Sequence, residues 1–196
     1  MSWDFLLFVQ VWPVSWIYLN NTNNNFTNDY FTIHGIWPDN TNGPYPEYCA
    51  KEYLNLTTLA DVLADLAKYW TDFTDPYSLI KHEYEKHWTC LQDDPLLDTA
   101  HKYFSMGLSL RNKINIYALL RDCQIIPSNS VKYETAILAN IISNYTGHRI
   151  VITCDDNSVL NEIRFCYDTH IQPIDCCQKA IDEQCPEHTI WYRELV

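Results

Sequence analysis

FTIHGIWPDN, residues 31–40, and KHEYEKHWTC, residues 81–90, are the two stretches that say most about the fold and chemistry of this chain. Together they supply three histidines, a glutamate and a lysine, namely His34, His82, Glu83, Lys86 and His87. Side chains of these types can exchange protons with a reacting group and stabilise charge without a metal ion. The two stretches therefore predict one acid–base site built from separate segments.

The second stretch has the spacing of a helix with two polar faces. If residues 80–89 are helical, His82 lies four residues before Lys86, and Glu83 lies four before His87 on an adjoining face. A solvated helix with ordinary ion pairs gives the same pattern, and this segment alone favours that alternative. The two histidines are one residue too far apart for an H-E-x-x-H motif, so the sequence predicts no metal site.

His34 shifts the balance toward a site. It stands between a predicted strand and Gly35 in apolar surroundings, where a lone histidine is more often part of the core. Cleavage of RNA, however, needs one group that takes the ribose 2′-hydroxyl proton and another that protonates the leaving 5′-oxygen. Two histidines on opposite sides of a phosphate perform both steps near their own pKa.

The length of 196 residues fits a single domain, residues 1–196, with one sizeable core. Hydrophobic residues make up 47% of the chain, and no run of eighteen apolar residues is present, so no membrane span is predicted. The net charge of −12 is unlike the basic surface of most nucleic-acid binders. RNA would have to be held by stacking and a few donors, or at acid pH, and plain solubility also explains the acidity.

Eight cysteines and four N-glycosylation sequons indicate a secretory route. The sequons are at Asn20, Asn25, Asn55 and Asn144. No basic segment precedes the apolar run at residues 5–9, so we find no signal peptide. We expect a mature chain, secreted or held in a lysosome-like compartment, from which the targeting segment has been removed.

Apolar periodicity places strands at both ends of the chain and helices between them. Strands are predicted at residues 4–12, 30–35, 149–153 and 160–167. Helices are predicted at residues 77–89, 96–113, 115–122 and 131–145, and over 59–70 with Thr57 or Thr58 as the N-cap. Residues 20–28 and 39–46 read as loops, and the tail from Gln172 as irregular. This order predicts an α+β fold with a central antiparallel sheet, flanked by several helices and stabilised by disulfides.

The two opening stretches resemble the active-site segments of the ribonuclease T2 family, the acid ribonucleases that include plant S-ribonucleases. DFLLFVQVWP, residues 4–13, is similar to the first strand of that family, and the likeness covers nearly the whole chain. The resemblance implies an α+β fold and metal-free, cofactor-free cleavage of single-stranded RNA, but not DNA. The reaction would pass through a 2′,3′-cyclic phosphate, best in mildly acidic conditions.

The resemblance also assigns catalytic roles by motif position. His87 would be the general base and His34 the general acid. His82 would bind phosphate, while Glu83 and Lys86 would stabilise the pentacoordinate transition state.

A base site is implied in the loop after His34. Trp37 would stack on a base, Asp39 would hydrogen-bond its edge, and Tyr45 would close the other side. Gln10 of the first strand is a further substrate-binding residue by resemblance. Stacking of this kind contributes about 1–3 kcal/mol per base, which counters the unfavourable net charge.

The chain departs from the family pattern in four places, one of which is the mild replacement of the commoner Trp by Tyr84. Trp88 stands where glycine is usual, and we expect its ring to pack in the core rather than face the cleft. The early disulfide of the family is missing, since no cysteine lies between Pro13 and Cys49. Val11 replaces a polar residue, which predicts weak selectivity at a second base subsite.

The remaining cysteines are paired here by resemblance, because eight cysteines allow 105 pairings. The implied bridges are Cys49–Cys90, Cys154–Cys185, and Cys166 with either Cys176 or Cys177. Cys123 is either free or bonded to the cysteine left over.

Two functions remain open on the sequence alone. One is a secreted acid endoribonuclease, monomeric by default. The other is a secreted glycoprotein that binds or signals through an impaired ribonuclease scaffold. An uptake receptor for its glycans fits either function. All five predicted catalytic residues are present, whereas a retired enzyme would have lost at least one, so catalysis is favoured.

Overall fold

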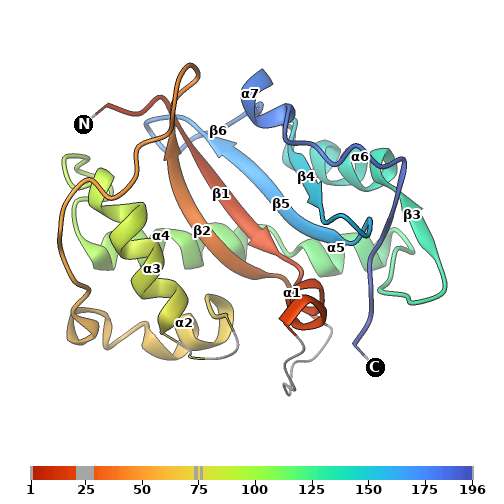
Figure 1. Cartoon of the computed structure of the whole chain (residues 1–196), viewed down its shortest axis with the longest axis horizontal. Coiled ribbons are helices and arrows are strands. Elements are labelled where there is room, and N and C mark those ends of the chain that lie inside the picture. Colours follow the sequence, from red (N-terminus) through yellow and green to blue (C-terminus); the bar gives the residue numbers. More distant parts are fainter. Residues whose placement is uncertain (1, 21–28, 73–74, 76, 196) are drawn as a thin grey trace.

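The fold is built around a five-stranded sheet in which segments from the two ends of the chain lie side by side (Figure 1). The computed structural model describes residues 2–20, 29–72, 75 and 77–195, without the side chains of residues 18–20. The strand order is β2 (Thr32–Asp39), β1 (Phe5–Val11), β5 (Leu160–Tyr167) and β4 (Val151–Cys154), with β6 (Pro173–Ile174) also paired to β5. All of these pairs are antiparallel.

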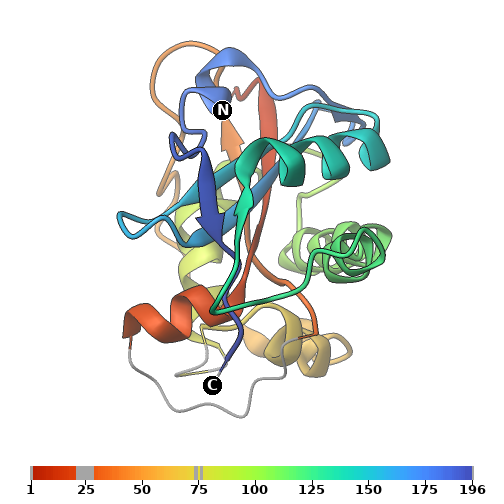
Figure 2. The same ribbon diagram turned by 90° about the vertical axis from the view of Figure 1, so that its right-hand side faces the viewer.

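Helices cover one face of the sheet and flank its edges. α4 (Ala100–Lys113) and α5 (Ile116–Asp122) lie behind the sheet in Figure 1 and on one side of it in Figure 2. α3 (Ser78–Lys86) contacts β2, and α6 (Thr135–Thr146) contacts β4. The other elements are α1 (Pro13–Asn20), α2 (Leu63–Tyr69), α7 (Gln178–Ile181), the 3-10 turns Leu56–Leu59 and Trp88–Cys90, and a small sheet of β3 (Lys132–Glu134) with β7 (Thr189–Trp191). No helix within these described ranges has the length and apolar character needed to cross a bilayer.

The side chains of β1 contribute to two apolar clusters on opposite faces. Leu6 and Phe8 belong to the main core, while Leu7 and Val9 belong to a smaller cluster. This division follows from the two-residue repeat of a strand. The smaller cluster covers only part of its face, and polar side chains of β2 and β5 occupy the rest.

The α+β fold is confirmed, and the predicted strands correspond to β1, β2, β5 and β4. Several boundaries were wrong. Asn55, rather than Thr57 or Thr58, caps the 3-10 turn before α2, and the predicted helix over 59–70 is split in two. The helix predicted over 131–145 begins only at Thr135, because residues 132–134 pair with β7.

Helix α1 and the ordered elements of the C-terminal tail were missed. α1 begins at Pro13, where we predicted only the end of a strand, and proline fits the first position of a helix. The tail contains β6, α7 and β7, which depend on distant partners such as β5 and β3. Most of the loop predicted at residues 20–28 lies outside the described residues.

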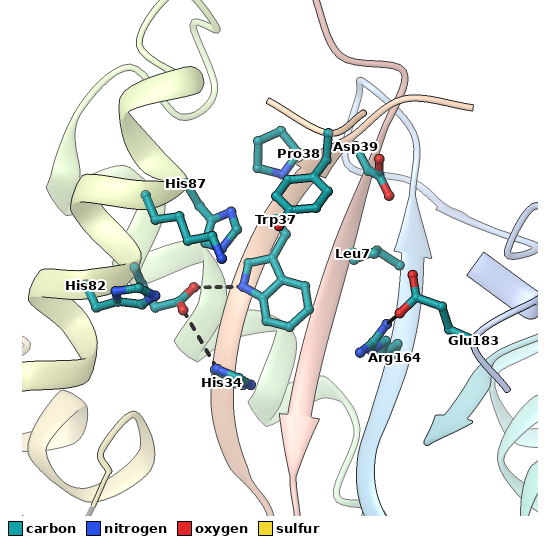
Figure 3. Close-up of a pocket in the computed structure, with 12 residues that line it drawn as sticks. Leu7, His34, Trp37, Pro38, Asp39, His82, His87, Arg164 and Glu183 are labelled. Carbon is teal, nitrogen blue, oxygen red and sulfur yellow. Dashed lines mark hydrogen bonds and ion pairs between the residues drawn. The ribbon is translucent and has the colours of Figure 1, made fainter. Parts of the chain in front are cut away.

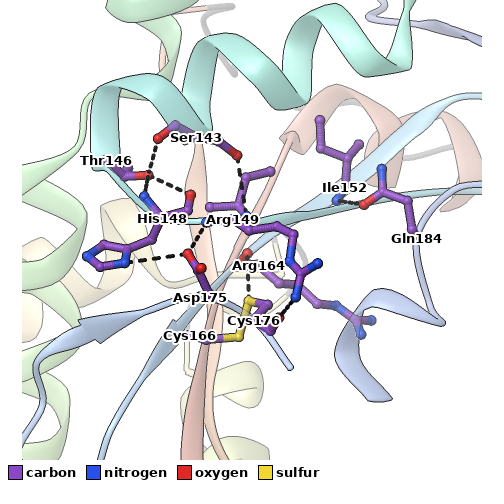
Figure 4. Close-up of a disulfide and its surroundings, with 11 residues drawn as sticks. Ser143, Thr146, His148, Arg149, Ile152, Arg164, Cys166, Asp175, Cys176 and Gln184 are labelled. Atoms are coloured by element: carbon purple, nitrogen blue, oxygen red, sulfur yellow. Dashed lines mark hydrogen bonds and ion pairs between the residues drawn. A yellow bond between two sulfur atoms is a disulfide. The ribbon is translucent and has the colours of Figure 1, made fainter. Parts of the chain in front are cut away.

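Three disulfides are present: Cys49–Cys90, Cys154–Cys185 and Cys166–Cys176. The third ties β5 to the segment before α7, where the Arg149 guanidinium donates to the Cys176 carbonyl at 3.0 Å (Figure 4). The alternatives that the sequence left open are thereby decided, since Cys176 is the partner of Cys166. Cys123 and Cys177 are both unpaired.

Candidate active site

A β-bulge at His34 turns this side chain toward the open face of the sheet. Val9 pairs with Gly35 and the next residue of β1 pairs with Ile33, so His34 is the extra residue on β2. Strict alternation would place His34 on the core face together with Ile36. The bulge lets Ile33 and Ile36 both enter the core while His34 projects from the other face. The Trp70 indole fixes this bend by donating to the His34 carbonyl at 2.7 Å.

Helix α3 presents the second group of candidate residues beside β2. His82, Glu83 and Lys86 lie in the helix, and His87 is its C-cap, with its backbone N–H bonded to the Glu83 carbonyl at 3.0 Å. Glu83 and His87 are buried, at 1% and 4% exposure, while His82 is exposed. The four-residue spacing that predicted one polar cluster is therefore realised on a helix.

Glu83 approaches β2 closely because residue 35 is glycine. Trp37 Nε1 donates to Glu83 Oε2 at 2.8 Å, and Glu83 Oε1 lies 3.9 Å from His34 Nε2. A Cβ atom at Gly35 would lie 2.0 Å from Glu83 Oε2 and 2.2 Å from Trp37 Nε1. Any side chain at this position would displace the carboxyl group of Glu83. The need for space therefore explains why glycine follows His34.

All five residues of the predicted acid–base set line one cavity of about 260 Å³ (Figure 3). The Trp37 indole lies between two of them. Its ring centroid is 5.0 Å from that of His34 and 5.4 Å from that of His87, where the two rings stack at 25°. The two stretches thus converge on one site.

The two histidines beside Trp37 have opposite electrostatic surroundings. Burial alone would lower the pKa of His34, but the 2.6 Å hydrogen bond to Glu162 and the charge of Glu83 outweigh it, so this pKa is raised. Burial, with the positive charges of Lys86 and His82, lowers the pKa of His87 to about 2. His34 therefore retains its proton where His87 is neutral, and such a separation suits an acid and a base.

Two further groups on α3 are shifted by their surroundings. Burial raises the pKa of Glu83 to about 7 against the opposing effects of His34, Trp37 and Lys86. Below neutral pH this carboxyl group is protonated and can donate a hydrogen bond. Burial and then the charge of Lys86 lower the pKa of His82, which lines both this cavity and a neighbouring one.

The loop after β2 forms one wall of the cavity. Asp39 is 5% exposed, and its Oδ1 accepts from the Asn40 backbone N–H at 2.7 Å and from Lys179 Nζ at 2.5 Å. Tyr45 is 44% exposed, and its ring centroid lies 5.7 Å from Lys86 Nζ. Trp37 is already packed against His87, so Tyr45 is the ring in the cavity with the more accessible face.

A second cavity, of about 540 Å³, shares His34 and His82 with the first. Val11 lines it, as do Trp16 and Leu79. Gln10 lines neither cavity, being 1% exposed on β1, so its expected contact with substrate stays a prediction.

Three charged residues near the site were missed in the sequence. Glu162 and Arg164 carried a signal, because the apolar alternation of residues 163, 165 and 167 places both on the opposite face of β5. Lys179 carried none. Its donation to Asp39, and to the Asn40 and Gly43 carbonyls at 3.0 and 2.9 Å, depends on α7 being folded back onto the loop.

Trp88 packs in the core, as expected. Its ring stacks on Tyr84 at 4.4 Å, and its indole donates to the Leu97 carbonyl at 2.9 Å. The ring is 6% exposed and does not line the cavity. The bulky residue beside His87 therefore leaves the site open.

The structure describes the side chains of two of the four sequon asparagines. Asn55 and Asn144 are exposed. Asn25 and the side chain of Asn20 lie outside the described residues. Within the described part of the chain, no group of three or more His, Cys, Asp or Glu side chains is arranged to hold a metal ion.

Comparisons with known proteins agree on one family. Residues 3–176 match the model of the Ribonuclease T2 family. Ribonuclease DdI of Dictyostelium discoideum is 34% identical over 177 residues, covering 89% of this chain and 78% of that protein. Ribonuclease T2 of Homo sapiens is 27% identical over 201 residues, covering 97% and 76%. The crystal structure of RNase NT in complex with 5′-AMP has a TM-score of 0.85 at 26% identity, with 100% of both chains covered.

Proposed function

The chain belongs to the ribonuclease T2 family and is an endoribonuclease, and we propose that it cleaves single-stranded RNA by metal-free transphosphorylation. His87 takes the proton of the ribose 2′-hydroxyl, whose oxygen attacks the adjacent phosphorus. The bond to the 5′-oxygen breaks, and His34 gives that oxygen a proton. The products are a 2′,3′-cyclic phosphate and a free 5′-hydroxyl. The observation that carries this assignment is the placement of two histidines on one cavity, with the Trp37 ring between them, and the pKa of His34 raised while that of His87 is lowered supports it.

Three other side chains stabilise the phosphate as charge develops on it. Glu83, protonated below a pKa of about 7, donates to a non-bridging oxygen instead of repelling it. Lys86 supplies a positive charge at the same wall of the cavity, and the exposed His82 binds the incoming phosphate. Loss of one such donor typically costs about 10²–10³ in kcat.

An acidic optimum follows from these protonation states. His87 must be neutral, and its pKa of about 2 allows that in all but strongly acid solution. His34 and Glu83 must both hold protons, and both of their pKa values are raised; the hydrogen bond to Glu162 favours the proton on His34 even when Glu83 is neutral. Activity is therefore lost as the pH rises through the pKa of Glu83, about 7, and through that of His34.

The two cavities give RNA a path across the site. The phosphate lies at His34 and His82, which the cavities share. One base occupies the wall formed by Asp39 and Tyr45, and the next nucleotide enters the cavity lined by Val11. Val11 offers no hydrogen bond, so selectivity is weak there. DNA is not cleaved because it lacks the 2′-hydroxyl.

The protein acts as a monomer outside the cytosol, secreted or in a lysosome-like compartment. Three disulfides support this location, since such bonds persist in oxidising compartments. Exposed Asn55 and Asn144 are acceptors for glycans, which an uptake receptor could bind.

The test is cleavage of a short RNA at pH about 5 in EDTA, with the same DNA sequence and a His34→Phe protein in parallel. We expect 2′,3′-cyclic phosphate ends from RNA only, and their loss in His34→Phe. His101→Phe is the matched control, since His101 is a partly exposed histidine paired with Asp61 outside the cavity. Cleavage that requires a divalent ion, or that leaves no cyclic phosphate, would overturn the proposal.

A further inference from the structure

Glu162 has both carboxylate oxygens engaged at the edge of the site. Its Oε1 lies 2.6 Å from Nδ1 of His34. Its Oε2 accepts from two nitrogens of Arg164, Nε at 2.9 Å and Nη2 at 2.8 Å. Arg164 is in turn paired with Glu183 on the surface, as Figure 3 shows. Because Glu162 is only 5% exposed, water competes little for these bonds.

The register of the sheet brings this network together. Val11 of β1 pairs with Glu162, and Val9 pairs with both Arg164 and Gly35, so Glu162 and Arg164 share the face of the sheet that the bulge gives to His34. His34 lies on β2, and Glu162 and Arg164 lie on β5, two strands of the same sheet that are both paired with β1 between them. Their relative positions are therefore fixed by backbone hydrogen bonds and not by flexible loops.

We infer that Glu162 is the positioning residue of His34, holding its proton on Nδ1 and directing Nε2 toward the scissile phosphate, and that Arg164 holds Glu162 in place. The inference rests on the proposed role of His34 as general acid. An arginine can only donate hydrogen bonds, so it fixes Glu162 as an ionised acceptor. The Glu162 carboxylate then accepts a hydrogen bond from His34 Nδ1–H and stabilises the imidazolium form, as a carboxylate does for the histidine of a serine protease.

Several charged groups face His34 and must be weighed together. They are His82, Glu83 and His87 from α3, Glu162 and Arg164 from β5, and Asp72 in the second cavity. Glu83 Oε1 is 3.9 Å from Nε2, beyond hydrogen-bond distance, whereas Glu162 is in direct contact with Nδ1. Burial would raise the pKa of Glu162, but His34 and Arg164 lower it overall, so Glu162 stays ionised in the acidic range.

Glu162→Gln separates this role from a merely structural one. Arg164 can only donate, so the amide oxygen of the glutamine must face Arg164 and its NH₂ group must face His34 Nδ1. That NH₂ group needs an acceptor, which moves the proton of the neutral ring to Nε2 and disfavours the imidazolium. We expect ¹⁵N NMR of His34 to show the reversed tautomer and a lower pKa. The alkaline limb of kcat/KM should move to lower pH, and kcat should fall about 10²–10⁴-fold.

Two other variants complete the experiment. Glu162→Asp keeps the charge but shortens the reach, so the tautomer should be retained and activity partly rescued. Glu134→Gln removes an exposed carboxylate on β3 and should leave both the His34 spectrum and the pH profile unchanged. Should Glu162→Gln not fold, Arg164→Lys provides the test, because a single ammonium group cannot make the two-pronged contact and the His34 pKa should fall.

The inference is overturned if Glu162→Gln folds and His34 keeps both its tautomer and its pKa. If only Arg164→Lys folds, an unchanged His34 pKa in that variant overturns it. The NMR measurement needs no RNA, so it is independent of the proposed function. The two proposals can therefore fail separately. If the wild type does not cleave RNA, but the His34 tautomer and pKa differ between the wild type and Glu162→Gln, the mechanism is disproved and the positioning contact stands.

Discussion

The two sides of the catalytic cavity hold the same residue type in opposite ways. On the sheet side, His34 lies among carboxylates, 2.6 Å from Glu162 and 3.9 Å from Glu83. On the helix side, His87 is buried at the end of α3 near Lys86 and His82, and its Nδ1 has no hydrogen-bond partner in the described structure. The sheet side therefore favours a protonated imidazole and the helix side a neutral one. In the mechanism we propose, the neighbours of each histidine set the direction of proton transfer.

The largest effects are expected from removing either histidine. His34→Phe and His87→Phe should each lower kcat on RNA by about 10²–10⁴-fold. A uridine 3′-phosphate ester with a nitrophenyl leaving group distinguishes them, because that group departs without a proton. His34→Phe should regain most of its activity on this substrate, and His87→Phe should not.

Equal losses by both variants on the activated ester would contradict the assignment of acid and base. Recovery by His87→Phe alone would reverse it. The His101→Phe variant, which replaces a partly exposed histidine outside the cavity, should cleave both substrates at the wild-type rate.

The pH profile tests the proton that the proposal places on Glu83. Wild-type kcat should fall as the pH rises above about 7, because Glu83 loses its proton there and then repels the phosphate. In Glu83→Gln the loss of kcat that comes from deprotonation of Glu83 should vanish, so that only the loss caused by deprotonation of His34 remains on the alkaline side. The maximal rate should drop about 10²–10³-fold, because the amide replaces the carboxylic acid donor. An unaltered alkaline limb in Glu83→Gln would show that another group titrates, with Glu134→Gln as the control.

The helix side is expected to depend on the disulfide Cys49–Cys90 for stability and for turnover. Cys49–Cys90 closes a separation of 41 residues and ties the base-site loop to the turn after His87. Cys49→Ser should lower the free energy of unfolding by about 2–5 kcal/mol and reduce turnover. Chemical denaturation and RNA cleavage measure the two effects. Cys123→Ser removes an exposed free cysteine and should change neither. Equal behaviour of the two variants would show that the bridge does not support the site.

The smallest effect is expected at the outer rim of the cavity. Lys179→Met frees Asp39 and the carbonyls of Asn40 and Gly43, so the base-site loop should loosen. We expect KM for dinucleotides to rise roughly two- to fivefold, with kcat little changed. Lys102→Met breaks a surface ion pair with Asp98 and serves as the control. A large fall in kcat in Lys179→Met would mean that the loop orients the phosphate as well as the base.

Prediction from sequence worked where the signal is local and strongly periodic. The alternation of residues 160–167 gave β5 with its observed bounds, and Gly147 does end α6, in the left-handed conformation that glycine readily adopts. Prediction from sequence was wrong where a distant segment decides the local secondary structure. Residues 132–134 would continue a helix by their own preferences, but β7 offers them a strand partner. The N-cap was misplaced because Asn55 and Thr57 are both good capping residues.

The sequence by itself determined the family and the fold class and indicated a candidate acid–base set, because motif spacing and residue chemistry are properties of the chain alone. Only the tertiary structure decided the surroundings of each group. The bulge at His34 is a matter of register between β1 and β2, and Glu162 and Lys179 reach the site from the far end of the chain. The pKa of a side chain depends on burial and on charges within a few ångströms, which no single segment specifies. Hence the sequence, through its resemblance to the family, indicated His34 as the acid and His87 as the base, while the surroundings that suit each histidine to its role came only from the folded protein.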